Sequence, residues 1–417
     1  MSRRIPLLLL GLAALVLTSS VGAAARPVDT NQADLSTNEG VAAYLSSRGL
    51  NAKGFVIQRG RLNYAGPKCP GRKWKCTKKT KVVQVASGKH GRNRVDCDGA
   101  LTQTTNAVTC IVVQNATSGK NKARCSLSAR DVSPVVLDCR ITQTNVEGDN
   151  IARVRERVAQ RDGADQRATV NALVTQTNGT GDNESDVNQR INQRSDEVSM
   201  ATVPTQNQEG RFTGRIAQTS DSGSNDSRLI QDLDQSGRAS GGTNIVQRQL
   251  GEGLGDVDQT IGDVGEGATV NSKSKPRKSG KSKRSKSFSK SFARQTEHQR
   301  LQGPGQQTQI GPFSCCSTQL GGDPDRTQTR IRQRSHQKAS QATAEQSISL
   351  EGTCTTVGDC GIRHRAQNNE DSIRVLQRCV ATEGGTCSLF VPTTCESEGC
   401  TSGGGGEGSA SLKKRRP

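Results

Sequence analysis

The sequence predicts an all-β protein built as an irregular β-solenoid, with ladders of Gln and Asn in its core and disulfides that staple the coils. Three observations support this prediction. An aliphatic residue followed two positions later by glutamine recurs along the chain, Asn and Gly cluster between these pairs, and the 14 cysteines fall into two groups. A small N-terminal α/β segment and a long disordered basic linker and tail complete the predicted architecture.

The first 25 residues are typical of a secretory signal peptide, and we assign residues 1–25 to it. Arg3 and Arg4 precede the apolar run IPLLLLGLAALVL, and Ala23-Ala24-Ala25 offers a cleavage site. The apolar run is too short to favour a membrane anchor. We therefore expect a secreted or cell-surface protein that does not span a membrane after cleavage of the signal.

Residues 26–66 are predicted to form a small helix–strand segment. Ser36 to Glu39 resembles a capping box, apolar residues follow at helical spacing, and Gly49 is a suitable helix stop. The stretch FVIQ at 55–58 is typical of a short strand. Residues 67–140 then form the cysteine-rich, basic start of the repeat region.

The repeat region itself is assigned to residues 141–270. The pairs of aliphatic residue and glutamine in the whole chain are Val82/Gln84, Leu101/Gln103, Val112/Gln114, Ile141/Gln143, Val158/Gln160, Val174/Gln176, Val187/Gln189, Ile191/Gln193, Ile216/Gln218, Leu229/Gln231, Leu233/Gln235, Ile245/Gln247, Val257/Gln259, Ile331/Gln333 and Val375/Gln377. Within 141–270 they recur mostly at a period of about 13 residues, which is typical of a repeat architecture.

Residues i and i+2 of a strand share one face, so the aliphatic residue and the glutamine are expected to point inward together. Stacked strands lie about 4.8 Å apart, which lets glutamine amides donate to and accept from one another. Two alternatives stay open. The low hydrophobicity and net charge of +19 favour a disordered Gln/Asn-rich chain, and residues 153–160 could form a helical turn.

Two stretches resemble the curlin repeat of bacterial surface amyloid subunits, S-x5-Q-x4-N-x5-Q. Asn183-ESDVN-Gln189 and Asn225-DSRLI-Gln231 match the N-x5-Q half of that repeat. Gln176 and Gln218 precede these asparagines with six intervening residues rather than four, and the serine half is not kept. The resemblance covers residues 169–259, and it implies a fold of stacked, amide-bearing strands.

The cysteines are predicted to form disulfides rather than metal sites, because the chain has no C-x-x-C pair and its four histidines are scattered. The candidates are Cys69, Cys76, Cys97, Cys110, Cys125, Cys139, Cys315, Cys316, Cys354, Cys360, Cys379, Cys387, Cys395 and Cys400. The spacing from Cys97 to Cys139 is close to the repeat period, so we expect one cysteine per coil in a single column, bridged between successive coils. A small disulfide knot without repeats is the alternative.

Residues 271–294 are predicted to be a basic disordered linker, followed by a second Gln/Cys-rich region at 295–400 and a Gly-rich basic tail at 401–417. Basic runs bind polyanions through salt-sensitive contacts. The polyanion-binding candidates are Lys273, Lys275, Arg277, Lys278, Lys281, Lys283, Arg284, Lys286, Lys290 and Arg294. The alternative is a solvated linker that only keeps the protein soluble.

No catalytic, cofactor-binding or metal-ligating set is evident in the sequence, and no small-molecule substrate is suggested. We therefore expect a non-enzymatic exported structural or adhesive protein of the cell surface or extracellular matrix, held to anionic polymers by its basic segments. Self-association through the edges of the repeats is a further expected contact. The alternative function is that of a disordered secreted polycation that coats anionic surfaces.

Overall fold

A computed structural model describes residues 37–47, 50–88, 90–101, 106–161, 163, 165–199, 205–240, 246–262, 288–303, 306–321, 327–340, 345–356, 359–367, 372–380 and 385–393. The chain divides into two units, residues 1–51 and 52–417. None of the helices among the described residues has the length and apolar character needed to cross a bilayer.

The first unit contains one described helix, α1 (Asn38–Ser47). The Gly40 amide donates to Thr37 Oγ1 at 3.0 Å, so the hydroxyl of Thr37 caps the first turn. The helix predicted after the capping pattern is therefore confirmed, and Ser36 lies outside the described residues.

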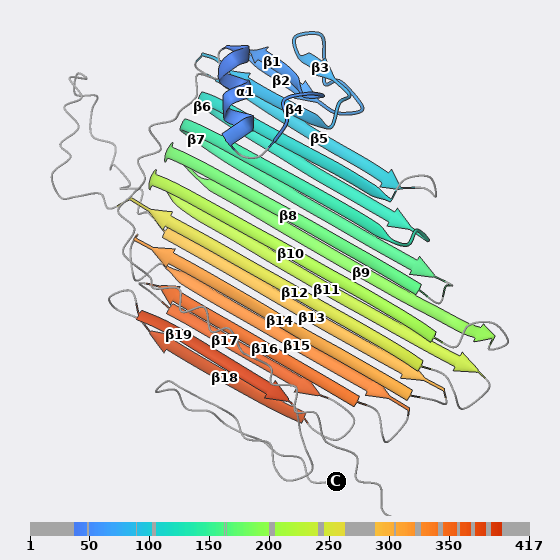
Figure 1. Ribbon diagram of the computed structural model, residues 1–417. Helices are drawn as coiled ribbons and strands as arrows, with labels where there is room; N and C mark the ends of the chain where they lie inside the picture. Colours follow the sequence, from blue (N-terminus) through green and yellow to red (C-terminus); the bar gives the residue numbers. More distant parts are fainter. Residues whose placement is uncertain are drawn as a thin grey trace, which may run out of the picture. The chain divides into compact units, whose positions relative to one another are not determined.

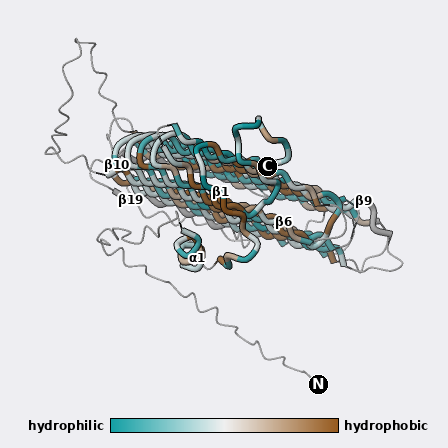
Figure 2. The backbone as a smooth tube through the Cα atoms, turned by 90° about the horizontal axis from the view of Figure 1, so that it is seen from above, coloured by the Kyte–Doolittle hydropathy of each residue, from teal (hydrophilic) through white to brown (hydrophobic). Residues whose placement is uncertain are grey.

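The second unit is a two-layer β-solenoid (Figures 1 and 2). Its strands are β1 (Val56–Gly60), β2 (Leu62–Ala65), β3 (Lys75–Thr77), β4 (Lys81–Ala86), β5 (Gly91–Leu101), β6 (Ala107–Arg130), β7 (Val135–Arg161), β8 (Asp165–Thr180), β9 (Asn183–Ser199), β10 (Thr205–Ser222), β11 (Ser224–Ser240), β12 (Val246–Ile261), β13 (Phe288–Gln302), β14 (Gln306–Leu320), β15 (Gln328–Ala339), β16 (Glu345–Thr356), β17 (Asp359–Gln367), β18 (Ser372–Val380) and β19 (Gly385–Thr393). The predicted all-β solenoid is confirmed.

Consecutive strands lie alternately in two layers. Within each layer, a strand pairs in parallel with the strand one turn away. The first layer contains β1, β4, the N-terminal halves of β6 and β7, and then β8, β10, β12, β14 and β16. The second layer contains β2, β5, the C-terminal halves of β6 and β7, and then β9, β11, β13, β15 and β17. Figure 2 shows the two layers stacked face to face.

One turn of the solenoid therefore comprises two strands, which corrects the predicted period. Gln176 lies on β8 in the first layer and Gln189 on β9 in the second, whereas the Cα partner of Gln176 in the next turn is Gln218. A spacing of about 13 residues is thus half a turn. The sequence pattern could not reveal this, because both layers carry the same pairing of an aliphatic residue with glutamine.

The solenoid also corrects the predicted segment boundaries. The expected border at 140/141 lies inside β7, and the region from 295 continues the same coils. The basic linker was expected to reach residue 294, but β13 begins at Phe288, and its first residues alternate between inward Ser and outward Phe or Lys. The alternative of a helical turn at 153–160 is wrong, as is disorder for the described part of 140–260. Residues 1–25, 271–287 and 401–417 lie outside the described residues.

The core between the layers is thin and partly polar. Val187, Gln189, Ile191 and Gln193 all have exposed fractions of 0 %, so the predicted inward pairing of aliphatic residue and amide is confirmed. Glycines on the facing layer make room for these side chains. A Cβ at Gly214, for example, would lie 2.6 Å from Leu229 Cδ1.

The buried amides form columns along the stacking direction, each donor bonded to the neighbouring turn. The longest column in the first layer joins Gln58, Gln84, Gln114, Gln143, Gln176, Gln218, Gln259 and Gln319 through Nε2 to Oε1 bonds of 2.7–2.9 Å. The longest asparagine column in the second layer joins Asn63, Asn93, Asn121, Asn150, Asn183 and Asn225 at 2.9–3.0 Å. Hydrogen bonding to both neighbours offsets the cost of burying these amides.

The C-terminal end of the solenoid differs from the rest. β18 pairs with β17 and β19 pairs with β16, in both cases antiparallel. The chain therefore reverses direction in its last described pair of strands.

Candidate polyanion-binding face

Four disulfides are present among the described residues, namely Cys69–Cys76, Cys97–Cys110, Cys125–Cys139 and Cys354–Cys360. The expected single column of cysteines is wrong. Cys97 and Cys125 are Cα partners in the second layer, and Cys110 and Cys139 are Cα partners in the first. The disulfides Cys97–Cys110 and Cys125–Cys139 each cross the core and join the end of one turn to the start of the next.

The adjacent Cys315 and Cys316 were also disulfide candidates, yet neither pairs with a described cysteine. Neighbouring residues of a strand point to opposite faces, so Cys315 is buried and Cys316 points outward. Burial raises the pKa of the Cys315 thiol, which keeps it protonated and unreactive. The side chains of Cys379 and Cys387, and all of Cys395 and Cys400, lie outside the described part.

Only two of the ten predicted polyanion-binding residues fall within the described part, because Lys273 to Lys286 precede β13. Lys290 and Arg294 both point outward from β13. The Lys290 ammonium lies 5.1 Å from the centre of the Phe288 ring. Arg294 Nη2 forms an ion pair with Asp232 Oδ2 at 2.9 Å. These two residues are therefore part of an ordered sheet rather than of a linker.

Arg294 belongs to a larger cluster on the outer surface of the second layer, which we call the arginine face. Its members are Arg294 on β13, Arg332 and Arg334 on β15, and Arg363 and Arg365 on β17. Each strand places its arginines outward because the residues between them, such as Gln333, face the core. The alternation of the strand therefore sets the positions of all five guanidinium groups.

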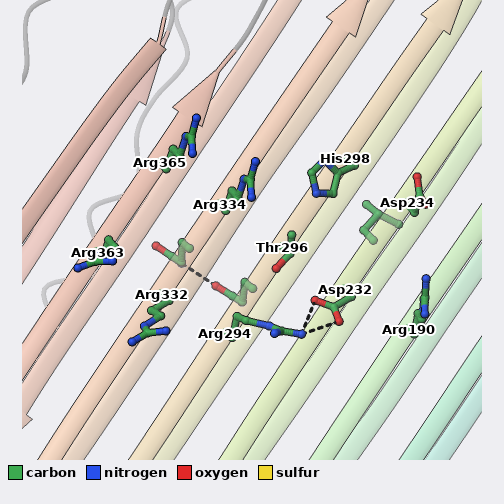
Figure 3. A pocket seen from close by; sticks show the side chains of 13 residues that line it. Arg190, Asp232, Asp234, Arg294, Thr296, His298, Arg332, Arg334, Arg363 and Arg365 are labelled. Carbon is green, nitrogen blue, oxygen red and sulfur yellow. Dashed lines mark hydrogen bonds and ion pairs between the residues drawn. The ribbon is translucent and has the colours of Figure 1, made fainter. Parts of the chain in front are cut away.

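Parallel pairing brings these arginines into columns. Arg294, Arg332 and Arg363 are successive Cα partners, as are Arg334 and Arg365. Figure 3 shows Arg332 and Arg363 extending one way along the strands, and Arg334 and Arg365 the other way. Between and beside them lies an open depression of about 590 Å³.

The charges of the arginine face are largely uncompensated. Arg294 is neutralised by Asp232, but among the described residues no carboxylate forms an ion pair with Arg332, Arg334, Arg363 or Arg365. Like charges one strand spacing apart repel each other, and they attract an anion that can contact several of them.

A pair of histidines borders this face. His298 and His336 are Cα partners, and their ring centres are 5.8 Å apart in an edge-to-face arrangement. Burial and the nearby Arg334 lower the pKa of His298, which Asp234 and Asp232 partly oppose. Burial, His298 and Arg334 lower the pKa of His336, with smaller contributions from Lys338 and Arg365.

The outer surface of the first layer is different. There Arg211 contacts Glu209 and Glu252, and Arg215 contacts Asp256 and Asp258, at 2.6–3.6 Å. Arg211 and Arg215 are thus neutralised within the sheet. The arginine face could not be predicted from runs of basic residues, because its arginines are separated by inward-facing residues. The available signal was the stretch Arg330-Ile-Arg-Gln-Arg334, where basic residues alternate with an inward Ile/Gln pair.

The fold and the face together define a class of protein, a two-layer parallel β-solenoid with an amide-laddered core and a cluster of arginines on the outer surface of the second layer. No protein-family model, curated protein or solved structure matches the chain.

Proposed function

We propose that the protein is a non-enzymatic, exported structural or adhesive component of a cell surface or extracellular matrix, which binds anionic polymers. The observation that carries the proposal is a set of four guanidinium groups on one surface that no carboxylate among the described residues neutralises, namely Arg332, Arg334, Arg363 and Arg365. Binding through such a surface needs fixed charges and a rigid support, and it needs no reactive group.

The rigid support is provided by the amide columns and the disulfides that cross the core. A residue such as Gln176 is held by the neighbouring turns on both sides, at 2.7 Å in each case. Disulfides of this kind persist in oxidising, extracellular surroundings, which supports export. The basic segment 273–286 adds further salt-sensitive attraction for polyanions.

The test compares retention of the oxidised full-length mature chain on a heparin resin in a salt gradient. In one variant, Arg332, Arg334, Arg363 and Arg365 are changed to Gln. The control variant carries the same loss of charge on the first layer, with Arg140, Arg167, Arg215 and Arg248 changed to Gln. We expect the first variant to elute at clearly lower salt than the control. Elution of both at one salt concentration would overturn the role of the arginine face.

A further inference from the structure

The histidine pair and the arginine face are close enough to act on one ligand. His336 lies two residues from Arg334 on β15, and His298 lies two residues from Thr296, the Cα partner of Arg334. The charged groups that face the pair are Asp232 and Asp234 on β11, Arg300 on β13, Arg334 and Lys338 on β15, and Arg365 on β17. The amide-bearing Gln367 on β17 is the Cα partner of His336.

We propose that the arginine face and the pair His298/His336 form one binding site for a polymer that carries sulfate esters on successive units, and that binding tightens as the histidines take up protons. The inference rests on the proposed function, and it adds the ligand class and the control by pH.

The geometry of the arginines favours a polymer over a small anion. Within a column, neighbouring Cα atoms lie about 4.8 Å apart along the stack. The two columns lie about 6.6 Å apart along the strands. A single anion can contact only part of such a grid, whereas linked anions gain from each further contact at a high effective concentration. Guanidinium groups bind the oxygens of sulfate in a two-pronged manner.

The surroundings of the site argue against nucleic acid. Single-stranded nucleic acids are usually held by aromatic rings on which bases stack. The ring of Phe292 beside this face is half-buried, and the guanidinium groups of Arg228 and Arg332 lie 6.0 and 5.7 Å from its centre. The ring is thus already covered by cations and does not offer a stacking surface.

The histidines add charge under acidic conditions. In the free protein, Arg334 and burial hold both imidazoles neutral at neutral pH. A bound sulfate would offset the nearby positive charge and favour the protonated imidazoles. Binding and protonation must then favour each other by linkage, so the affinity rises as the pH falls. A sulfate ester keeps its charge over this range, whereas a carboxylate polymer begins to lose its own.

The experiment measures binding of the oxidised full-length chain to dextran sulfate by calorimetry at about pH 5 and about pH 7.5, at constant ionic strength. Where one proton is taken up on binding, we expect the affinity to rise about tenfold for each unit by which the pH falls. His298→Gln with His336→Gln should keep the affinity at the higher pH and lose most of the gain. His90→Gln, which changes a distant histidine, serves as the control.

Two further probes separate the parts of the proposal. Carboxymethyl dextran of equal charge density should bind more weakly than dextran sulfate, and equal binding would overturn the assignment of sulfate esters. An equal affinity at both pH values would overturn the role of the histidines while the proposed function stands. Absence of binding to either polymer at both pH values would overturn the proposed function as well.

Discussion

At the scale of single residues, two carboxyl groups occupy core positions that uncharged residues fill in the neighbouring turns. Glu156 accepts a hydrogen bond from Gln189 Nε2 at 2.9 Å, and Glu297 accepts one from the hydroxyl of Ser335. Both side chains have an exposed fraction of 0 %, and each has one oxygen without a described partner. Burial raises the pKa of Glu156 well above its ordinary value and that of Glu297 to about 8. The carboxyl group of Glu297 is therefore mostly protonated in the folded protein at neutral pH.

The Glu297 carboxyl makes stability depend on pH. Its folded pKa of about 8 exceeds the ordinary value of 4.5, so the folded state holds the proton more tightly than the unfolded state. Its contribution is fully present below about pH 4.5 and is lost as the pH rises towards about 8. As the pH rises from about 4.5 to about 8, we expect Glu297→Gln to unfold at a progressively higher urea concentration than the wild type. At about pH 8 its free energy of unfolding should exceed that of the wild type by a few kcal/mol.

The control for this prediction is Glu345→Gln, which removes an exposed carboxyl group from β16. Urea unfolding midpoints of the three proteins are measured from about pH 5 to about pH 9. A constant difference between Glu297→Gln and the wild type at every pH would contradict the prediction.

Breaking an amide column should cost more than losing one hydrogen bond. Replacing Gln176 by Leu leaves Gln143 Oε1 without its donor and the buried hydroxyl of Ser185 without its acceptor, and Gln218 Nε2 loses one of its acceptors. We expect a loss of about 3 kcal/mol in the free energy of unfolding, since each buried unsatisfied group costs about 1–3 kcal/mol. Thr177→Val, on the exposed face of the same strand, should change it by less than about 0.5 kcal/mol. Equal losses for Gln176→Leu and Thr177→Val in chemical denaturation would show that the amide column contributes little to the free energy of unfolding.

At this scale the sequence predicts the inward residues well where the pattern is uninterrupted. The pair Val187/Gln189 alternates with polar neighbours, and both members are buried as expected. Glu156 could not be predicted in the same way, because it stands between Arg155 and Arg157 and looks like part of a solvated charged stretch. Its burial depends on Gln189 in the next turn, which a local pattern does not show.

At the scale of elements, glycines set the bends where β6 and β7 pass from one layer to the other. Gly119 and Gly148 are Cα partners with φ of 119° and 126°, a region that side chains rarely adopt. A Cβ at Gly148 would collide with the carbonyl oxygen of Gly119. These positions therefore require glycine for both conformation and space.

We expect Gly148→Ala to destabilise the protein by at least about 1 kcal/mol, because the new methyl group forces neighbouring turns apart. The matched control is Gly163→Ala, since no atom lies within 4 Å of a Cβ at Gly163 and its φ is not positive. Thermal unfolding of the two variants and the wild type provides the measurement. A larger loss for Gly163→Ala than for Gly148→Ala would contradict the assigned role of the bend.

The strands themselves could be predicted from alternation, but their pairing could not. Asn183 and Asn225 were singled out for their common spacing to a following glutamine, and they are Cα partners. Nothing in their local sequence shows that β8 and β9 lie in different layers. That assignment follows from packing across the core, as in the crossing disulfides of Cys97 and Cys125.

At the scale of the whole molecule, the two surfaces of the solenoid carry charge in different ways. Arginines such as Arg215 in the first layer are paired within the sheet, whereas Arg334 and Arg365 in the second have no described acidic partner. The net charge of +19 alone does not reveal this division, because it depends on which face of each strand the charges occupy.

Export of the molecule can be tested directly. The arrangement of Ala23-Ala24-Ala25 predicts that the secreted chain begins at Arg26. Mass spectrometry of the protein recovered from the medium of an expressing cell should show this N-terminus and intact disulfides. Recovery of the full-length chain, with Met1 and reduced cysteines, from inside the cells would contradict the prediction.

The reversal of the last two strands limits how copies of the molecule can join. The column that contains Gln295 and Gln333 ends at His364, whose Cα partner on the reversed strand is Val375. A second copy that adds to this end would therefore have to pair with strands that run against the direction of the other turns. We expect copies to stack less readily at this end than successive turns stack within one chain.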